Sequence, residues 1–341
     1  MSLLRINKLF STAPHVKNSF QHLKERALIK VEGPDASEFL QGLITNDIRH
    51  ISNSVGSMFT MFLNIKGRIL FDTLIYKTNV PDSFWLECDS QVSNSLQKHL
   101  KMYKVRRRVD ISPLTEYNVH VLFNTECIKL KPRSANALDG DSDKEILPAN
   151  SNEIKNHRGM LIFKDPRALH LGYRLISPNS MDSAEIIKDL FICETSISYK
   201  KLRYTLGIGE GVGDLSVGSS FPLECNCDYL HGVSFHKGCY IGQELTARTY
   251  HTGVIRKRLM PLLFTKPPKT LPENDVIVHS GVNVGKLKGV FENVGLALLR
   301  VEKALKFGNI TVGDGEASVI KPNWWPIELP KEKQDSGQTS L

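Results

Sequence analysis

Residues 236–249 read HKGCYIGQELTART, so that Cys239 follows a glycine and is followed by a second glycine and a helix-forming run. Glycine permits backbone conformations and close approaches that a side chain would block, which favours a bend that presents the thiol. A helix beginning at Gln243 would place free N–H groups and a positive dipole end near Cys239. His236 and Lys237 add positive potential. Each effect favours thiolate over thiol, as in a nucleophile or a metal ligand.

The same thiol is open to two other interpretations. A single cysteine is most often a small apolar residue packed in the interior. A Cys-His-acid hydrolase is the second alternative, but His236 lies in the same loop as Cys239 and no specific third group stands out. The local sequence therefore leaves Cys239 open between a packed residue and a reactive or metal-binding one.

A pair of cysteines, Cys225 and Cys227, precedes Cys239, and His231 and His236 lie between. Structural zinc sites usually combine a C-x2-4-C pair with a second pair of ligands. Here the first pair has the spacing C-x-C and the second pair is missing from the sequence, which disfavours a self-contained zinc site. A cluster completed by cysteines of another protein stays open, because one thiolate can serve as one ligand among several.

Composition sets the class of protein. The chain has 341 residues, of which 41% are hydrophobic, enough for two or three domains with cores. No apolar run is long enough for a membrane-spanning helix. Six irregularly spaced cysteines do not resemble a disulfide framework, which favours reduced thiols in a reducing compartment.

The N-terminus is basic and amphipathic. No acidic residue precedes Glu25, while basic residues alternate with apolar ones and with Ser and Thr. This pattern predicts a mitochondrial transit peptide over residues 1–23 and a location in the mitochondrial matrix; the alternative is a disordered basic tail. Its removal would lower the formal net charge from +8 to +5, which weakens any charge-based case for nucleic acid. The basic residues removed would be Arg5, Lys8 and Lys17.

Periodicity predicts mixed α+β structure for residues 24–258. Asp35 and Glu38 have the spacing of a helix-starting capping box, and Gly67 suits a hairpin turn. His99 falls on or beside the apolar face of a helix and is expected to be a packing or surface residue rather than a ligand. A polar stretch at 131–157 is expected to be a mobile loop insertion. The predicted strands are 27–31, 57–63, 69–76, 83–87, 117–123, 160–163 and 171–176, and the predicted helices begin at Asp35 or cover 90–103, 183–193 and 196–206.

The C-terminal part has a different character. Short strand candidates follow one another, separated by Gly and Pro and without a long helix, which predicts a small β-barrel over residues 259–325. The polar residues 326–341 are expected to form a disordered tail. The strand candidates are 256–264, 275–279, 283–291, 295–300 and 310–312.

Two basic runs, at 104–108 and 256–258, allow a third interpretation, RNA binding. The first run has no interleaved aromatic residues for base stacking. We expect it to be a solvated edge, with Val105 and Val109 facing inward on a strand, and we expect no nucleic acid and no membrane insertion.

Residues 237–244 resemble the K-G-C-x-x-G-Q-E signature of the YgfZ-type proteins, relatives of the folate-dependent aminomethyltransferase (T-protein) of the glycine cleavage system. The similarity spans roughly residues 25–325, and the octapeptide is specific. With the transit-like N-terminus, the nearest members are the mitochondrial iron–sulfur assembly factors of this family. Further matching positions are Gly33 to Ala36, Phe39 to Leu43, Asp47, Lys66 to Ile69, Arg203, Leu206 to Ile208, Pro222 to Glu224, Gly285, Gly295 and Arg300.

The resemblance implies a ring of three parts, in which two α+β parts share a folate-type cleft and a small C-terminal β-barrel follows. It also implies a role late in the maturation of [4Fe–4S] proteins. The implied partners are A-type iron–sulfur scaffold proteins and [4Fe–4S] client apoproteins. The alternative from the enzyme class is a tetrahydrofolate-dependent one-carbon (aminomethyl) transferase.

The resemblance also assigns candidate site residues. Cys239 takes the role of cluster ligand or reactive thiol. Asp72 and Arg203 match cleft positions associated with folate, so that tetrahydrofolate is a candidate cofactor. The remaining candidates belong to the signature and are Lys237, Gly238, Gly242, Gln243 and Glu244.

One departure bears on the choice of function. The T-protein has two adjacent acids at the hairpin end, whereas Phe71 stands at the first of these positions and cannot bind a folate amine. A stable iron–sulfur cluster normally takes four protein ligands, and Cys239 is the one strong candidate here. We therefore expect a transient [2Fe–2S] cluster shared with a partner and no resident metal.

Overall fold

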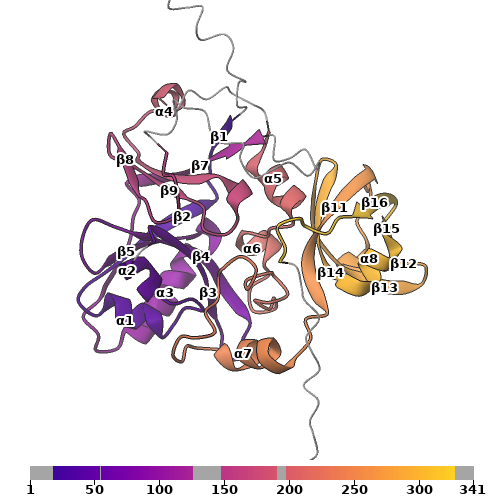
Figure 1. Cartoon of the computed structure of the whole chain (residues 1–341), viewed down its shortest axis with the longest axis horizontal. Helices are drawn as coiled ribbons and strands as arrows, with labels where there is room; N and C mark the ends of the chain where they lie inside the picture. The colour runs from indigo at the N-terminus through magenta and orange to yellow at the C-terminus, as the bar shows by residue number, and fades with distance from the viewer. Residues whose placement is uncertain (1–17, 54, 126–146, 190–196, 327–341) are drawn as a thin grey trace, which may run out of the picture.

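The computed structural model describes residues 18–53, 55–125, 147–189 and 197–326. Figure 1 shows two sheets at the left, one above the other, and a β-barrel at the right. The short helix α6 (Gly211–Asp214) lies between these three bodies, and α7 (Gln243–Thr252) lies below the lower sheet. Among the described helices, none is both long and apolar enough to span a membrane.

The lower sheet is antiparallel and carries helices on one face. Side chains such as Ile29, Phe62 and Leu96 are fully buried between the sheet and these helices. The strands, in order across the sheet, are β3 (Ser57–Leu63), β4 (Ile69–Lys77), β5 (Ser83–Asp89), β2 (Arg26–Glu32) and β6 (Asp110–Pro113), and the helices are α1 (Ala36–Gln41), α2 (Arg49–Asn53), the 3₁₀ turn η1 (Ser90–Val92) and α3 (Ser93–Lys104).

Most local predictions for this sheet are confirmed, including the β3–β4 hairpin, in which Gly67 has a φ of 71°. His99 packs against the rings of Phe62 and Phe71. Two predictions are wrong. The Asp35 side chain does not cap α1, because it accepts hydrogen bonds from the backbone N–H and guanidinium of Arg108.

The second wrong prediction concerns Val105. It is 82% exposed with a φ of 48°, directly after α3, and not inward on a strand. Val109 is buried as expected. The prediction assumed that side chains alternate between the two faces of one strand from Val105 to Val109. Because α3 ends at Lys104, Val105 is not part of such a strand.

The upper sheet is also antiparallel. The predicted β9–β10 hairpin is confirmed, with Leu175 opposite Ile162. Its strands, in order, are β1 (Asn18–His22), β7 (Tyr117–Asn124), β10 (Tyr173–Pro178), β9 (Met160–Lys164) and β8 (Lys155–His157), with the 3₁₀ turn η3 (Leu169–Leu171) and the helix α4 (Ser183–Asp189).

Two expected segments overlap this sheet. Residues 131–157 were expected to form a mobile loop insertion, but this prediction is wrong at the C-terminal end of the segment, where β8 pairs with β9. Residues 126–146 lie outside the described residues. The expected leader, residues 1–23, overlaps β1, which pairs with β7 along its whole length. Leu23 is also fully buried. A leader that ends before Asn18 would keep this edge strand in the fold.

The barrel is a six-stranded antiparallel sheet that nearly closes on itself. Its two outer strands, β12 and β15, meet where the Thr311 N–H donates to His279 Nδ1 at 3.2 Å. The predicted barrel strands are confirmed, but β16 and a short helix, α8, were missed. In order, the strands are β12 (Val276–His279), β13 (Val282–Phe291), β14 (Val294–Arg300), β11 (Lys257–Lys266), β16 (Gly315–Val319) and β15 (Asn309–Val312), with the 3₁₀ turn η4 (Glu273–Asp275) and α8 (Val301–Phe307).

The two sheets and the barrel are joined through α5 (Tyr199–Leu206) and α6. Tyr199, Leu202 and Tyr204 on α5 belong to one large buried cluster with side chains of both sheets and of the barrel strands β11 and β14. The three bodies therefore pack as one unit around the middle of the chain.

Candidate functional site

Cys239 lies on an exposed loop that leads into α7. The other cysteines in the described part of the chain, Cys88, Cys225 and Cys227, are buried. Burial raises the pKa of Cys225 to about 12 and that of Cys227 well above its usual value. Cys127 and Cys193 lie outside the described residues. Cys239 is thus the thiol that solvent and a partner can reach among those described.

The loop is anchored by Lys237. Its Nζ donates to the carbonyl oxygens of Gln41, Ile44 and Asn46, each at 2.7 Å. Burial lowers the pKa of Lys237 to about 7, and the three carbonyls oppose this shift, because three acceptors satisfy the three N–H groups of an ammonium. Two of these carbonyls lie at and just beyond the C-terminal end of α1, where a cation is favoured. From the sequence, Lys237 was expected to act as a positive charge beside the thiol. In the structure its side chain instead attaches the cysteine loop to the end of α1 and the residues that follow it.

Further hydrogen bonds attach the loop to the connection between α1 and β3. The Ile241 N–H donates to the Gly42 carbonyl at 3.1 Å, and the Ser234 N–H donates to the Thr45 carbonyl at 3.1 Å. Asn46 Nδ2 donates to the His231 carbonyl at 2.7 Å. The residues that follow α1, from Gly42 to Asn46, thus hold the cysteine loop in place through hydrogen bonds.

The two glycines of the signature have different roles. Gly242 has a φ of 78°, and a Cβ there would lie 2.3 Å from the carbonyl oxygen of Asn64. A Cβ on Gly67 would lie 3.0 Å from the Gly242 carbonyl oxygen, so the tip of the β3–β4 hairpin packs directly on the start of α7. At Gly238, in contrast, a Cβ would have no heavy atom of the described residues within 4 Å. The fold needs glycine at 242 but not at 238.

The first turn of α7 contacts the thiol. Gln243 Oε1 accepts the Tyr240 N–H at 2.9 Å, and Gln243 Nε2 lies 4.0 Å from Cys239 Sγ. Glu244 is exposed in the same turn, where a carboxylate complements the positive end of the helix dipole. The predicted helix start at Gln243 is therefore confirmed, and the signature residues from 237 to 244 are brought together.

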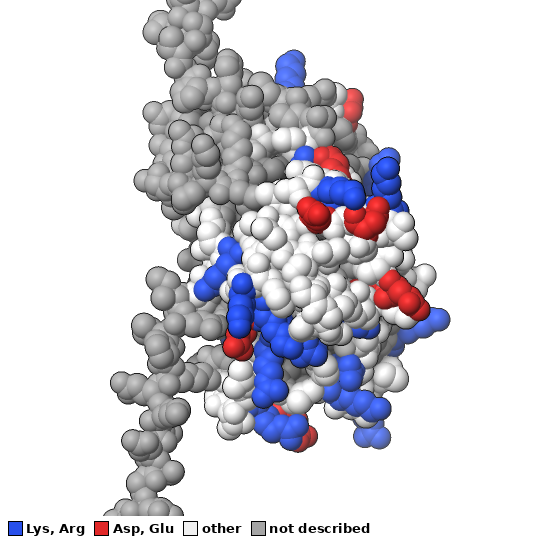
Figure 2. Space-filling view, turned by 90° about the vertical axis from the view of Figure 1, so that its right-hand side faces the viewer, with Lys and Arg blue, Asp and Glu red and all other residues white. Residues whose placement is uncertain are grey.

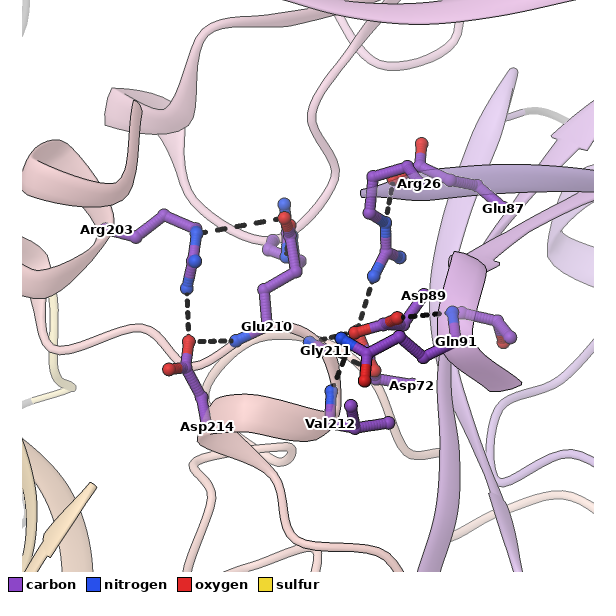
Figure 3. Close-up of polar contacts among 12 residues, drawn as sticks. Arg26, Asp72, Glu87, Asp89, Gln91, Arg203, Glu210, Gly211, Val212 and Asp214 are labelled. Atoms are coloured by element: carbon purple, nitrogen blue, oxygen red, sulfur yellow. Dashed lines mark hydrogen bonds and ion pairs between the residues drawn. The ribbon is translucent and has the colours of Figure 1, made fainter. Parts of the chain in front are cut away.

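The other two candidates, Asp72 and Arg203, lie elsewhere, in a buried charged network (Figure 3). Both carboxylate oxygens of Asp72 accept the Gly211 N–H at 3.2 Å, and Asp72 Oδ2 lies 3.4 Å from Arg26 Nη1. Asp89 accepts the Val212 N–H at 3.0 Å. Two carboxylates of the lower sheet thus bind the first backbone N–H groups of α6.

Arg203 lies at the other end of this network. Its Nη1 donates to Asp214 Oδ2 at 2.6 Å and to the Ile208 carbonyl at 3.1 Å. Asp214 also accepts the Tyr204 hydroxyl at 2.7 Å. Arg203 and Asp214 are both less than 10% exposed. Nη1 of the guanidinium is therefore occupied by groups of the protein itself, whereas Nε has no hydrogen-bond partner among the described residues and lies 3.7 Å from Glu210 Oε1.

Glu210 connects the parts of the network. Its carboxylate lies 2.7 Å from Arg167 Nη1 and 2.5 Å from Arg174 Nη2. Arg174 lies 3.4 Å from Glu87, which in turn binds Arg26 at 2.7 Å. Burial alone would raise the pKa of Glu210, but the surrounding guanidinium groups hold it well below its usual value.

Sequence reasoning missed Arg26, Glu87, Arg174 and Glu210. For Arg26, Glu87 and Arg174 the available signal was a charged residue inside an otherwise apolar strand, since such residues are almost never buried unless paired. Glu210 directly precedes α6 and gave no such signal. Within the described residues, none of the network's hydrogen bonds or ion pairs includes the signature segment 237–244. The protein therefore has two polar centres, which we call the cysteine loop (residues 231–242) and the buried network (the charged residues joined through Glu210 and Asp72).

Most members of the two basic runs are paired with carboxylates. Arg258 is buried, binds Asp228 at 2.8 Å and covers the Tyr229 ring at 3.6 Å. Lys257 pairs with Glu224 at 2.9 Å. In the first run, Lys104, Arg107 and Arg108 face Asp110, Glu38 and Asp35 within 4 Å.

Comparison with known proteins gives the family of the chain. Residues 256–327 match the family model "CAF17, C-terminal beta-barrel domain". The structure is similar to that of the glycine cleavage system aminomethyltransferase T from Bartonella henselae, with a TM-score of 0.67 at 16% identity over 91% of this chain and 86% of that one. This likeness shows the fold and confirms the expected T-protein-like α+β architecture with a C-terminal barrel.

Sequence relatives extend along nearly the whole chain. The iron–sulfur cluster assembly factor IBA57 of Homo sapiens is 38% identical over 323 residues, covering 89% of this chain and 84% of that protein. The homologue from Mycosarcoma maydis is 31% identical, with the same coverage of 89% and 84%. Together with the signature at 237–244 and the barrel match, these similarities show that the chain belongs to the family of the mitochondrial iron–sulfur cluster assembly factor IBA57.

Proposed function

We propose that this protein is a mitochondrial iron–sulfur cluster assembly factor that acts late in the maturation of [4Fe–4S] proteins. Cys239 supplies a thiolate to a [2Fe–2S] cluster that is shared with an A-type scaffold protein and passed on to client apoproteins. The observation that carries this proposal is the exposure of Cys239 on an anchored loop, while the other described thiols are buried. Soft thiolate ligands suit iron–sulfur clusters.

Sharing of the cluster follows from the number of available ligands. A cluster normally takes four protein ligands, and the described part of the chain exposes one thiol. The remaining ligands would come from the scaffold, so that the cluster is cargo at an interface. A firmly anchored loop is useful there, because it presents the thiol without an ordering cost at each encounter.

The tetrahydrofolate-dependent transferase is not supported by the residues that the resemblance assigned to the folate cleft. Asp72 is 5% exposed and its two oxygens already accept the Gly211 N–H and face Arg26. Arg203 is likewise bound by Asp214 and Ile208. Phe71 is buried and has no polar group for a folate amine. These residues do not fit a bound folate, and we derive no reaction step through one.

The mitochondrial location rests on two observations. The relatives carry the word mitochondrial in their names, and the first 24 residues contain basic but no acidic side chains. We infer a matrix protein with a leader that ends before Asn18, because β1 begins there and completes the edge of the upper sheet.

The test is an anaerobic mixture of the protein with an A-type scaffold that carries [2Fe–2S]. We expect the wild type to form a complex with the visible absorption and circular dichroism of a bound cluster, and Cys239→Ala to lose the cluster signal. The matched control is Cys225→Ala, which removes a buried thiol and should retain the cluster signal with some loss of stability. Because Cys239 is exposed, its substitution should leave thermal unfolding unchanged. A complex and cluster unaffected by Cys239→Ala would contradict the proposal.

A further inference from the structure

Three large apolar side chains are exposed near the cysteine loop. Ile65 at the tip of the β3–β4 hairpin is 81% exposed, Tyr250 on α7 is 41% exposed, and Val254 just after α7 is 76% exposed. Single exposed apolar residues are normal, so their significance depends on whether they lie together.

The packing places them around the cysteine loop. The hairpin tip that carries Ile65 lies against Gly242, three residues after Cys239. The Tyr250 ring stacks on Phe235 of the cysteine loop, with 3.5 Å between the ring centroids and 10° between the planes. Val254 follows two residues after the end of α7. Ile65 and Tyr250 therefore lie on the hairpin and the helix that pack against the cysteine loop, and Val254 follows that helix in the chain.

Basic side chains accompany these apolar ones. Lys66, Arg248 and Arg256 are exposed, and none of the three forms an ion pair with any residue that the structure describes. Arg256 differs in this from its neighbours in the second basic run, because Lys257 and Arg258 are both paired with carboxylates. Figure 2 views the molecule from the barrel side and shows lysine and arginine side chains gathered in the lower half, the end at which α7 lies in Figure 1.

We propose that this surface, which we call the thiol face (Ile65, Lys66, Arg248, Tyr250, Val254 and Arg256), is a docking surface for an acidic protein that carries the iron–sulfur cluster. The inference rests on the proposed function and adds the chemistry of the partner: carboxylates around its cluster and an apolar contact at the centre. Apolar anchors within a charged rim are the usual anatomy of a protein interface.

A protein partner fits this face better than RNA. Single-stranded nucleic acid is bound by aromatic rings on which bases stack. One face of the Tyr250 ring is already covered by Phe235, and Ile65 and Val254 are aliphatic. Unpaired basic side chains at the edge of this face attract an acidic partner over a distance that shortens as the salt concentration rises. Such attraction raises the association rate constant more than the affinity.

The test measures the dissociation constant of the A-type scaffold, loaded with [2Fe–2S], for the full-length protein under anaerobic conditions. We expect Ile65→Ser to weaken binding by about 10-fold, through loss of an apolar anchor. We expect the double variant Arg248→Glu with Arg256→Glu to weaken it about 10-fold or more at low salt and less at about 0.3 M salt. Matched controls on the barrel are Val278→Ser, which is 51% exposed, and Lys306→Glu on α8; both should bind as wild type.

The outcomes separate this proposal from the proposed function. If the thiol-face variants bind as wild type while Cys239→Ala loses the shared cluster, the docking surface is wrong and the proposed function stands. If the scaffold binds no form of the protein, both are wrong. Displacement of the scaffold by a single-stranded RNA oligonucleotide, with loss of RNA binding in Arg248→Glu with Arg256→Glu, would assign the thiol face to nucleic acid and overturn the proposal.

Discussion

The cysteine loop and the buried network are both built from polar residues, but they use these residues in opposite ways. In the buried network, Asp72, Glu210 and Arg203 are bound by other groups of the protein. In the cysteine loop, the Lys237 ammonium donates to three backbone carbonyls, whereas the Cys239 side chain is exposed. Chemistry with another molecule requires groups that the fold has not already satisfied. The carboxylates of the network are satisfied, although Arg203 Nε and two nitrogens of Arg174 have no hydrogen-bond partner among the described residues. The exposed thiol of the cysteine loop is therefore where we propose the function to lie.

The largest effect should come from opening the network. Glu210→Ala leaves Arg167 and Arg174 buried without their shared carboxylate. Breaking a buried ion pair by removing one partner typically costs about 3–5 kcal/mol. We expect this loss in the free energy of unfolding, measured with denaturant, while Cys239→Ala changes it by less than about 0.5 kcal/mol. Equal effects of the two variants would break the distinction between the two centres.

The pH dependence gives an independent check on Glu210. Its pKa is held well below the usual value in the folded protein, so the unfolded chain binds the proton more tightly. The stabilisation is therefore fully present above the ordinary pKa of about 4.5 for this carboxyl in the unfolded chain, and it is lost as pH falls toward the folded pKa. In Glu210→Gln the free energy of unfolding should fall less steeply below pH 4.5 than in the wild type. An identical slope in both proteins would contradict the ion-pair role of Glu210.

The contrast also explains what the sequence could predict. The cysteine loop could be predicted from local signals, namely the glycines at 238 and 242 and a helix beginning at Gln243. Its attachment through Lys237 to the carbonyls of Gln41, Ile44 and Asn46 could not. The buried network depends on which strands face one another. Glu87 lies on β5 of the lower sheet and Arg174 on β10 of the upper one, and no local pattern states that these two meet.

The errors in local structure have the same origin. Asp35 has the spacing of a cap, but Arg108, far along the chain, provides a charged partner that competes for its carboxylate. β16 was missed because its sequence, GEASV, has few apolar residues; it is recognisable only beside β11 and β15. Tertiary contacts override local propensity in both cases.

A second effect should come from the joint between the hairpin and α7. Gly242→Ala places a Cβ 2.3 Å from the Asn64 carbonyl oxygen at a φ of 78°. A left-handed conformation alone costs an L-residue about 1–2 kcal/mol, and the clash adds to this. We expect a loss of about 2 kcal/mol or more in the free energy of unfolding, together with loss of the shared cluster, because the loop moves. Unchanged stability in Gly242→Ala would mean that the hairpin does not hold the loop.

The smallest effect on stability should come from Gly238→Ala. Because this variant should fold normally, it tests the function of the cysteine loop separately from the stability of the fold. Among the described residues no heavy atom lies within 4 Å of a Cβ at this position, and a change at an open surface position usually alters the free energy of unfolding by less than about 0.5 kcal/mol. Gly238 nevertheless stands directly beside the thiol in the signature. If a partner or its cluster approaches the backbone there, Gly238→Ala should weaken scaffold binding or the cluster signal of the complex while thermal unfolding stays that of the wild type. A variant with normal stability and a normal shared cluster would show that no close approach occurs at Gly238, and that the cysteine loop presents the side chain of Cys239 alone.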